Sequence, residues 1–233
     1  MWRYVSPAFA NTFRVILFDH VGSGGSDLSA YDYGKYDSLH GYAADILEII
    51  DVLNLHDAVY VGHSVSAMMG VLAAVRTPAA FETLVLLSPS PCYLNDSDYR
   101  GGFEQHELDA LVDALDTNYL GWAASMAPVI MGNADRPELA DELTTSFCNT
   151  DPVIARHFAE VGFLSDNRAD LSRVSTPTLI LQSADDPIVP LPVGEFVQEH
   201  IPGSTFAVLP ASGHCLHLSD PAAVIGSILA FLD

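Results

Sequence analysis

The sequence predicts an α/β fold, in which a doubly wound, mostly parallel sheet carries an inserted group of helices. Short apolar runs of the size of buried parallel strands alternate with longer stretches of helical periodicity before residue 92 and after residue 173. Polar residues follow several of these runs directly, where doubly wound sheets place their functional sites. Only helical patterns occupy the segment between. We therefore expect a core formed by residues 1–91 and 174–233, and a helical lid insert formed by residues 92–173.

Five apolar runs are the predicted strands, at residues 14–19, 58–61, 83–88, 178–182 and 205–209. The first is followed by the glycine-rich stretch 20–27, which could suggest a phosphate-binding loop. That stretch lacks the Gly-Lys-Ser/Thr ending and no helix begins directly after it. A tight turn is therefore the favoured interpretation.

Helical periodicity indicates the elements between and after these strands. Residues 38–53 form an amphipathic pattern, residues 67–75 follow the second predicted strand, and Ser219-Asp220-Pro221 begins a last helix that runs to Leu232. Within the insert, helices are predicted around residues 104–116, 119–130, 137–147 and 152–161. An all-helical insert of this kind is typical of a cap over a site.

The pentapeptide Gly62-His63-Ser64-Val65-Ser66 lies between the second predicted strand and the helix after it. A serine on a tight strand-to-helix turn exposes its hydroxyl above the sheet, and the usual pattern is Gly-x-Ser-x-Gly. Serine is the next smallest choice for the last position, where two backbones approach closely. The N–H of Val65 opens the helix and can face a developing oxyanion.

Two further polar residues follow later strands in the order Ser, Asp, His that is expected of α/β-hydrolases. Asp185 and Asp186 come after residues 178–182, and His214 comes after residues 205–209. A serine hydroxyl needs a base, and the base needs a carboxylate that fixes its tautomer. We favour Asp186 over Asp185, because the Pro-Ile-Val-Pro turn after it would present its carboxylate at the strand end.

Composition narrows the function classes. The net charge is −21 and Lys35 is the only lysine, so the surface repels nucleic acid and anionic membranes. No apolar run approaches the roughly 18 residues that span a bilayer. Three scattered cysteines and the absence of a secretory leader pattern predict a cytoplasmic protein with reduced thiols. His214 and His217 lack further ligands for a metal, and no motif indicates a cofactor.

At this point the chain resembles a known family. The strings Gly-His-Ser-Val-Ser, Ser-Pro-Ser-Pro-Cys-Tyr-Leu-Asn-Asp at 88–96, Gly-Gly-Phe at 101–103, Asn-Tyr-Leu-Gly-Trp-Ala at 118–123, Phe-Cys-Asn-Thr-Asp-Pro at 147–152 and Ser-Gly-His-Cys-Leu-His at 212–217 are similar to those of RsbQ-type α/β-hydrolases. These are bacterial stress-signalling hydrolases related to the plant karrikin and strigolactone receptors. The resemblance covers essentially the whole chain.

The resemblance implies a core α/β-hydrolase domain with a V-shaped lid of four helices and a triad of Ser64, Asp186 and His214. It places Trp122, Met126, Phe163 and Val189 where the family lines a hydrophobic pocket. Bacterial members regulate a general-stress sigma factor alongside a phosphatase partner, through a small hydrophobic compound.

The family also has strands and a His-Gly-type oxyanion loop before the segment that begins here at Met1. We therefore expect an N-terminally truncated chain, in which the N–H of Val65 is the one identifiable oxyanion donor.

Two hypotheses follow. The first is a serine hydrolase of a small hydrophobic ester or lactone. The second is a ligand-responsive signalling protein with slow hydrolysis, in which the lid changes conformation and contacts a partner. Both require the same triad and pocket, so the sequence leaves the choice open.

Overall fold

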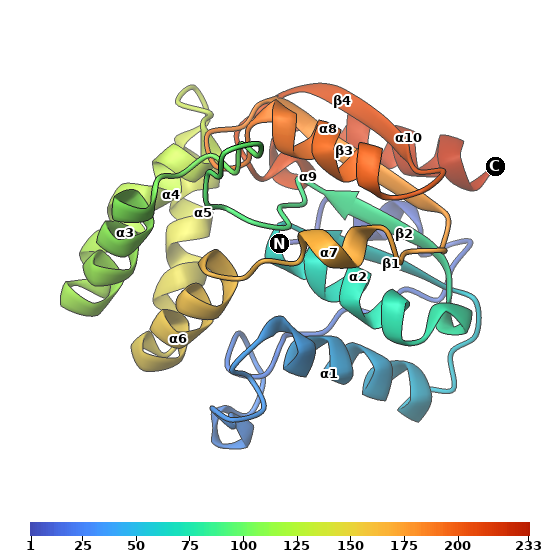
Figure 1. Cartoon of the computed structure of the whole chain (residues 1–233), viewed down its shortest axis with the longest axis horizontal. Helices are drawn as coiled ribbons and strands as arrows, with labels where there is room; N and C mark the ends of the chain where they lie inside the picture. The colour runs from blue at the N-terminus through green and yellow to red at the C-terminus, as the bar shows by residue number, and fades with distance from the viewer.

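The computed structural model describes all residues from 1 to 233 and contains one four-stranded sheet. Its strands are β1 (Ala58–His63), β2 (Phe81–Leu87), β3 (Thr178–Asp185) and β4 (Thr205–Ser212), in the spatial order β1-β2-β3-β4. All neighbouring pairs are parallel. The four later predicted strands are thus confirmed, and the carboxyl ends of β1, β2, β3 and β4 lie at one edge of the sheet (Figure 1).

Helices cover both faces of this sheet, as a doubly wound fold requires. Leu84 and Leu86 of β2 pack in one cluster with α1 (Leu39–Val52), α2 (Val65–Arg76) and α8 (Leu191–His200). Val85 and Leu87 point to the opposite face, where they pack with α9 (Leu216–Ser219) and α10 (Pro221–Leu232). The predicted helices at residues 38–53, 67–75 and 221–232 are confirmed, and the side chain of Asp220 caps α10.

Four helices fill most of the segment between β2 and β3. They are α3 (Gln105–Thr117), α4 (Tyr119–Met131), α5 (Pro137–Cys148) and α6 (Pro152–Phe163). Each matches a helix predicted from periodicity to within two residues. They form a group to one side of the sheet, which we call the four-helix segment (Figure 1). Short elements complete the chain: the helix α7 (Arg168–Leu171) and 3₁₀ turns at Ser6–Ala8, Leu28–Ala30 and Pro78–Ala80.

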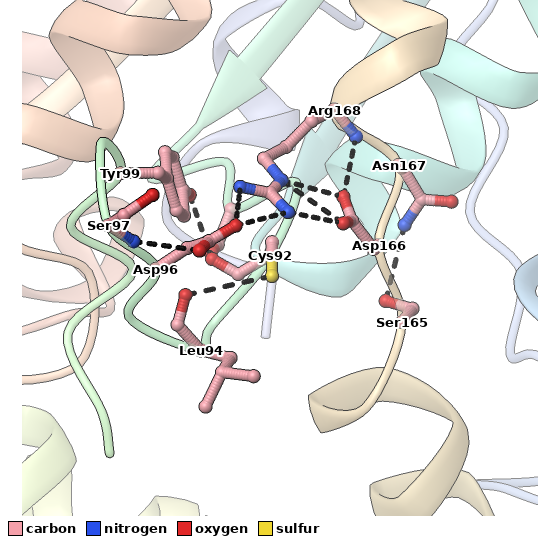
Figure 2. A network of polar contacts seen from close by, with 10 residues as sticks. Cys92, Leu94, Asp96, Ser97, Tyr99, Ser165, Asp166, Asn167 and Arg168 are labelled. Atoms are coloured by element: carbon pink, nitrogen blue, oxygen red, sulfur yellow. Dashed lines mark hydrogen bonds and ion pairs between the residues drawn. The ribbon is translucent and has the colours of Figure 1, made fainter. Parts of the chain in front are cut away.

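A polar network joins the two connections that lead into and out of the four-helix segment (Figure 2). The Arg168 guanidinium donates to Asp166 Oδ2 at 2.6 Å and lies 3.4 Å from Asp96 Oδ2, so it bridges the incoming and outgoing stretches. The same guanidinium stacks over the Tyr99 ring, whose hydroxyl donates to the Cys92 carbonyl at 2.8 Å. These contacts fix both ends of the insert against each other.

The prediction of a strand over residues 14–19 is wrong. These residues form no ladder, and none of their main-chain N–H groups donates a hydrogen bond. Strand formation needs a neighbouring main chain as partner, and here a cavity of about 730 Å³ lies between this segment and β1. The glycine-rich stretch after it is a set of turns, with Gly22 and Gly24 at positive φ. No helix of the fold combines the length and apolarity that crossing a membrane demands.

Candidate active site

Ser64 lies between β1 and α2 in a strained backbone conformation. Its φ is 56° and its ψ is −125°, a region that a residue with a side chain rarely adopts. The N–H of Ser64 donates to the carbonyl of Leu87 at 2.9 Å, which continues the β1–β2 pairing up to the turn. Its side chain is half-buried above the carboxyl ends of the strands.

The turn is tight enough to require glycine at position 62. A Cβ there would come within 2.8 Å of the Ser66 carbonyl oxygen and 2.9 Å of Ala67 Cα. The Tyr60 hydroxyl also donates to the Ser66 carbonyl at 2.8 Å, which closes the turn from below. Ser66 stands at the position where the pattern usually has glycine, and its hydroxyl lies 3.2 Å from His20 Nε2.

The structure brings Ser64, His214 and Asp186 together although they are far apart in the chain. His214 Nε2 lies 2.7 Å from Ser64 Oγ. On the other side of the ring, Nδ1 lies 2.9 Å from Asp186 Oδ2. Asp185, the alternative carboxylate, is exposed and lies 3.4 Å from the Ser212 hydroxyl instead. The geometry therefore selects Asp186 as the neighbour of the imidazole.

Asp186 is held as a carboxylate. Burial by itself would raise its pKa, but His214 and the N–H groups of Ile188 and Val189 outweigh that effect, and the pKa lies below the ordinary 3.8. Both N–H groups donate to Oδ1 at 2.9 Å. Gln182 was missed by sequence reasoning, although it is fully buried on β3 and donates to the Val189 carbonyl at 2.8 Å. It thereby anchors the turn that carries Asp186.

The loop of His214 is fastened to the end of α4. The N–H of His214 donates to the Ile130 carbonyl at 2.8 Å. Gly213 has a φ of 85°, and a side chain there would collide with the Met131 carbonyl. Gly132, also at positive φ, lies in contact with Gly213. The position of the imidazole thus depends on the four-helix segment, which the sequence pattern alone did not indicate.

Tyr93 is a second site residue that sequence reasoning missed. Its hydroxyl lies 3.2 Å from Ser64 Oγ, and its side chain is buried. Burial raises its pKa to about 12, so the hydroxyl stays protonated and can donate a hydrogen bond at neutral pH. Its place after β2, within the string Ser-Pro-Ser-Pro-Cys-Tyr at 88–93, was the available signal.

The other histidines near the site are neutral. Burial lowers the pKa of His63 to about 3, and its Nε2 lies 2.8 Å from the His214 carbonyl. His217 is completely buried, its pKa is also lowered by burial, and it stacks on the Trp2 ring at 4.6 Å. His63 and His217 therefore pack behind the serine turn and do not approach Ser64 Oγ as bases.

The structure distributes the four residues predicted to line one pocket over two neighbouring clusters that share Phe163. Val189 and Phe163 belong to a cluster with Tyr93 and Val65, next to the serine. Trp122 packs with Phe163 in the second cluster. Trp122 and Met126 also line a groove of about 540 Å³ between α3 and α4, which contains none of Ser64, Asp186 and His214. The i, i+4 spacing does put both side chains on one face of α4, as predicted, but that face borders α3.

This arrangement can move a proton along one line of hydrogen bonds. With Nδ1–H donated to Asp186, the free Nε2 can accept the proton of Ser64 Oγ. The N–H of Val65 opens α2, where the first-turn N–H groups have no acceptor within the helix. Such a group is available to an oxyanion that forms on a carbon bound to Ser64.

The chain is similar in sequence to known proteins over almost its whole length. A sequence profile described as the alpha/beta hydrolase family matches residues 1–226. A probable esterase from Oryza sativa subsp. japonica is 40% identical over 234 residues, which is 100% of this chain and 86% of the rice protein. Karrikin insensitive 2 receptor CA from Petunia hybrida is 37% identical over 230 residues, 98% of this chain and 85% of the petunia protein.

Solved structures show the same similarity. A hydrolase from Oleispira antarctica superposes with a TM-score of 0.96 at 41% identity. The superposition covers 99% of this chain and 85% of the other.

Proposed function

Because the chain belongs to the alpha/beta hydrolase family, we propose that it is a serine hydrolase that cleaves a small hydrophobic ester or lactone. The observation that carries this proposal is the continuous hydrogen-bond line from Ser64 through His214 to Asp186, with spacings of 2.7 and 2.9 Å. Ser64 is the nucleophile, His214 is the general base and acid, and Asp186 holds the imidazole.

In the proposed reaction, Ser64 Oγ attacks the carbonyl carbon while its proton passes to His214 Nε2. The proton then moves to the departing alcohol oxygen as the acyl–oxygen bond breaks, which leaves an acyl group on Ser64. Water attacks this ester with His214 again accepting the proton. The carboxylic acid departs and Ser64 regains its hydrogen, so the protein is unchanged after one turnover.

Two groups are suited to stabilise the oxyanion of the tetrahedral intermediate. The N–H of Val65 is one, because it belongs to the residue directly after the nucleophile. The Tyr93 hydroxyl is the other, since it is a buried donor 3.2 Å from Ser64 Oγ. Preorganised donors of this kind typically supply a factor of about 10²–10³ each in turnover.

The surroundings of Ser64 favour a small, uncharged and apolar substrate. Val65, Phe163 and Val189 belong to the apolar cluster beside it. The net charge of −21 disfavours anionic substrates. We propose that the four-helix segment is the lid over this site, since α4 both fastens the His214 loop and sends Ile130 into the same cluster.

The direct test is the hydrolysis of p-nitrophenyl acetate together with labelling by a fluorophosphonate, which reacts with activated serines. We expect the wild type to turn over the ester and to gain the mass of one label. In Ser64→Ala, turnover should fall by a factor of about 10⁴ or more, and the label should not attach. The matched control is Ser227→Ala on α10, whose hydroxyl bonds only the Ala223 carbonyl. Equal rates for wild type and Ser64→Ala would contradict the proposal.

A second candidate function is ligand-responsive signalling with slow hydrolysis at the same site. Its support is that the related petunia protein is named a receptor while the rice protein is named an esterase. The RsbQ-type resemblance extends this candidate to bacterial general-stress signalling with a phosphatase partner. The cytoplasmic location proposed with it is supported by three free cysteines.

Turnover and binding separate the two candidates. A substituted butenolide, as a small hydrophobic lactone, raises the melting temperature of Ser64→Ala under either candidate, because binding stabilises the folded state. The signalling candidate additionally requires that wild-type turnover of the lactone is slow relative to ligand exchange. Repeated turnover of the lactone that is faster than ligand exchange, measured as product formed over time, would exclude the signalling candidate.

A further inference from the structure

The turn between α4 and α5, at residues 132–136, lies against the loop that carries His214. Gly132 ends α4 at a φ of 62°, and a Cβ on it would come within 3.0 Å of Gly213 Cα. An apolar cluster also joins both helices to Cys215, the residue directly after His214. The turn and the loop therefore meet through main-chain and side-chain contacts.

The side chain of Asn133 connects this turn to the end of β4. Its Nδ2 donates to the Ser212 carbonyl at 2.9 Å and to the Met131 carbonyl. Ser212 is the last residue of β4 and precedes His214 by two positions. One amide group therefore bonds the end of α4 and the end of β4 at the same time.

Arg136 holds this amide in place and bonds the other side of the loop. Its Nη2 donates to Asn133 Oδ1, and its Nη1 donates to the Ser219 carbonyl at 2.9 Å. Because a guanidinium can only donate, it fixes Oδ1 toward itself and leaves the NH₂ group for the two carbonyls. Ser219 is the last residue of α9, which follows His214.

These side chains act beside a main-chain contact at the histidine itself, since the N–H of His214 donates to the Ile130 carbonyl at 2.8 Å. The connection from α4 to α5 thus bonds the loop before, at and after His214. We call the side-chain part of this connection the Asn133–Arg136 clamp. From the core side, the loop is held by the N–H of Gly213, which donates to the Asp185 carbonyl at 2.7 Å.

We propose that Asn133 and Arg136 are positioning residues, through which the four-helix segment sets the place of the His214 imidazole relative to Ser64. This inference rests on the proposed serine hydrolase function. His214 Nε2 lies 2.7 Å from Ser64 Oγ, and a displacement of about 1 Å at such a contact can lower a rate by about 10²-fold. Movement of the turn at residues 132–136 away from the core would therefore withdraw the base from the nucleophile.

Asn133→Asp tests the clamp with almost no change in volume. The variant keeps an acceptor for Arg136, but its second oxygen faces the carbonyls of Met131 and Ser212, where the wild type has a donor. We expect kcat for p-nitrophenyl acetate to fall about 10- to 100-fold. KM should stay within about threefold, because His214 serves both half-reactions and both slow alike.

The matched control is Asn149→Asp, which makes the same change on the exposed residue at the other end of α5. It should leave kcat and KM unchanged. Arg136→Met provides a second, independent variant, since it keeps the apolar stem and removes both donors. Combined with Asn133→Asp, it should cost less than the product of the two separate losses, because the two side chains act through their mutual contact.

Amide hydrogen exchange, followed by mass spectrometry, gives a readout that needs no turnover. The N–H groups of Gly213 and His214 are both hydrogen-bonded, so their exchange reports local opening of the loop. In Asn133→Asp, exchange in a peptide covering residues 212–219 should be faster by about tenfold or more. Exchange in α10 should stay unchanged, which shows that the rest of the fold is intact.

Three results would overturn the proposal: unchanged exchange in residues 212–219, faster exchange there with an unchanged kcat, and an equal loss of kcat in Asn149→Asp. The second of these would show that the clamp serves stability alone. If the wild type neither hydrolyses the ester nor takes the fluorophosphonate label, the proposed hydrolase function fails separately. Hydrogen exchange then decides by itself whether the clamp holds the His214 loop.

Discussion

Replacement of Asp186 by asparagine gives a sharp test of how the site works. It exchanges one carboxylate oxygen for an amide NH₂ group and leaves the side-chain volume almost unchanged. Oδ1 of Asp186 accepts from the N–H groups of Ile188 and Val189 at 2.9 Å, so the asparagine carbonyl must take that place. The amide NH₂ then faces His214 Nδ1, which lies 2.9 Å from the present Oδ2. An NH₂ group donates only, so Nδ1 must become the acceptor and the ring proton moves to Nε2.

In that tautomer Nε2–H points at Ser64 Oγ and cannot take its proton. We expect kcat to fall by about 10⁴, which corresponds to about 5.5 kcal/mol of transition-state stabilisation. The assay is steady-state hydrolysis of p-nitrophenyl acetate, corrected by the rate of Ser64→Ala, with the melting temperature as a check on folding.

Asp185→Asn is the matched control, since it makes the same change one residue earlier on an exposed side chain. It should leave kcat unchanged. A folded Asp186→Asn protein that keeps kcat within about tenfold of wild type would refute the reasoning, as would an equal loss in Asp185→Asn.

Three other predictions concern the same site. Tyr93→Phe removes the hydroxyl beside Ser64 Oγ and should lower kcat by about 10²–10³-fold with little change in melting temperature, and an unchanged kcat would remove Tyr93 from the mechanism. Gly213→Ala forces a side chain against the end of α4 at a φ of 85°, so urea unfolding should show a loss of at least about 2 kcal/mol. Gly226→Ala, with open space around it inside α10, should instead gain about 0.5–1 kcal/mol, and a gain in both variants would contradict the argument. The pKa of Asp186 in the folded protein lies below the ordinary 3.8, so its carboxylate stabilises the fold above pH 3.8. This contribution is lost as the pH falls through the lower pKa of the folded state. Below about pH 4, the free energy of unfolding should therefore depend less steeply on pH in Asp186→Asn than in the wild type.

Local patterns predicted most of the fold. Apolar runs indicated β1, β2, β3 and β4, and periodicity with capping residues such as Asp220 indicated the long helices other than α8 to within about two residues. These signals are short in range, because an amphipathic face or a cap is complete within a few neighbouring residues. The candidate residues Ser64 and His214 were also recognisable, because each follows a strand in a characteristic turn.

The segment at residues 14–19 shows where local patterns stop. Its composition is that of a strand, but a strand exists only where another main chain supplies partners, and β1 lies across a cavity from it. Trp122 and Met126 make the same point for side chains. Their spacing placed them on one face of α4, whereas the direction of that face depended on how α3 packs against it.

The sequence by itself thus determined the class of fold and indicated the strand-to-helix turn at Ser64, with Ser64, Asp186 and His214 as the candidate site residues. Only the tertiary structure brought Asp186 to His214 Nδ1, placed Tyr93 beside the serine, and fastened the His214 loop to α4. The physical reason is distance along the chain. Each of these contacts joins groups that are close only after the sheet and the four-helix segment have packed together, and no local pattern encodes such a contact.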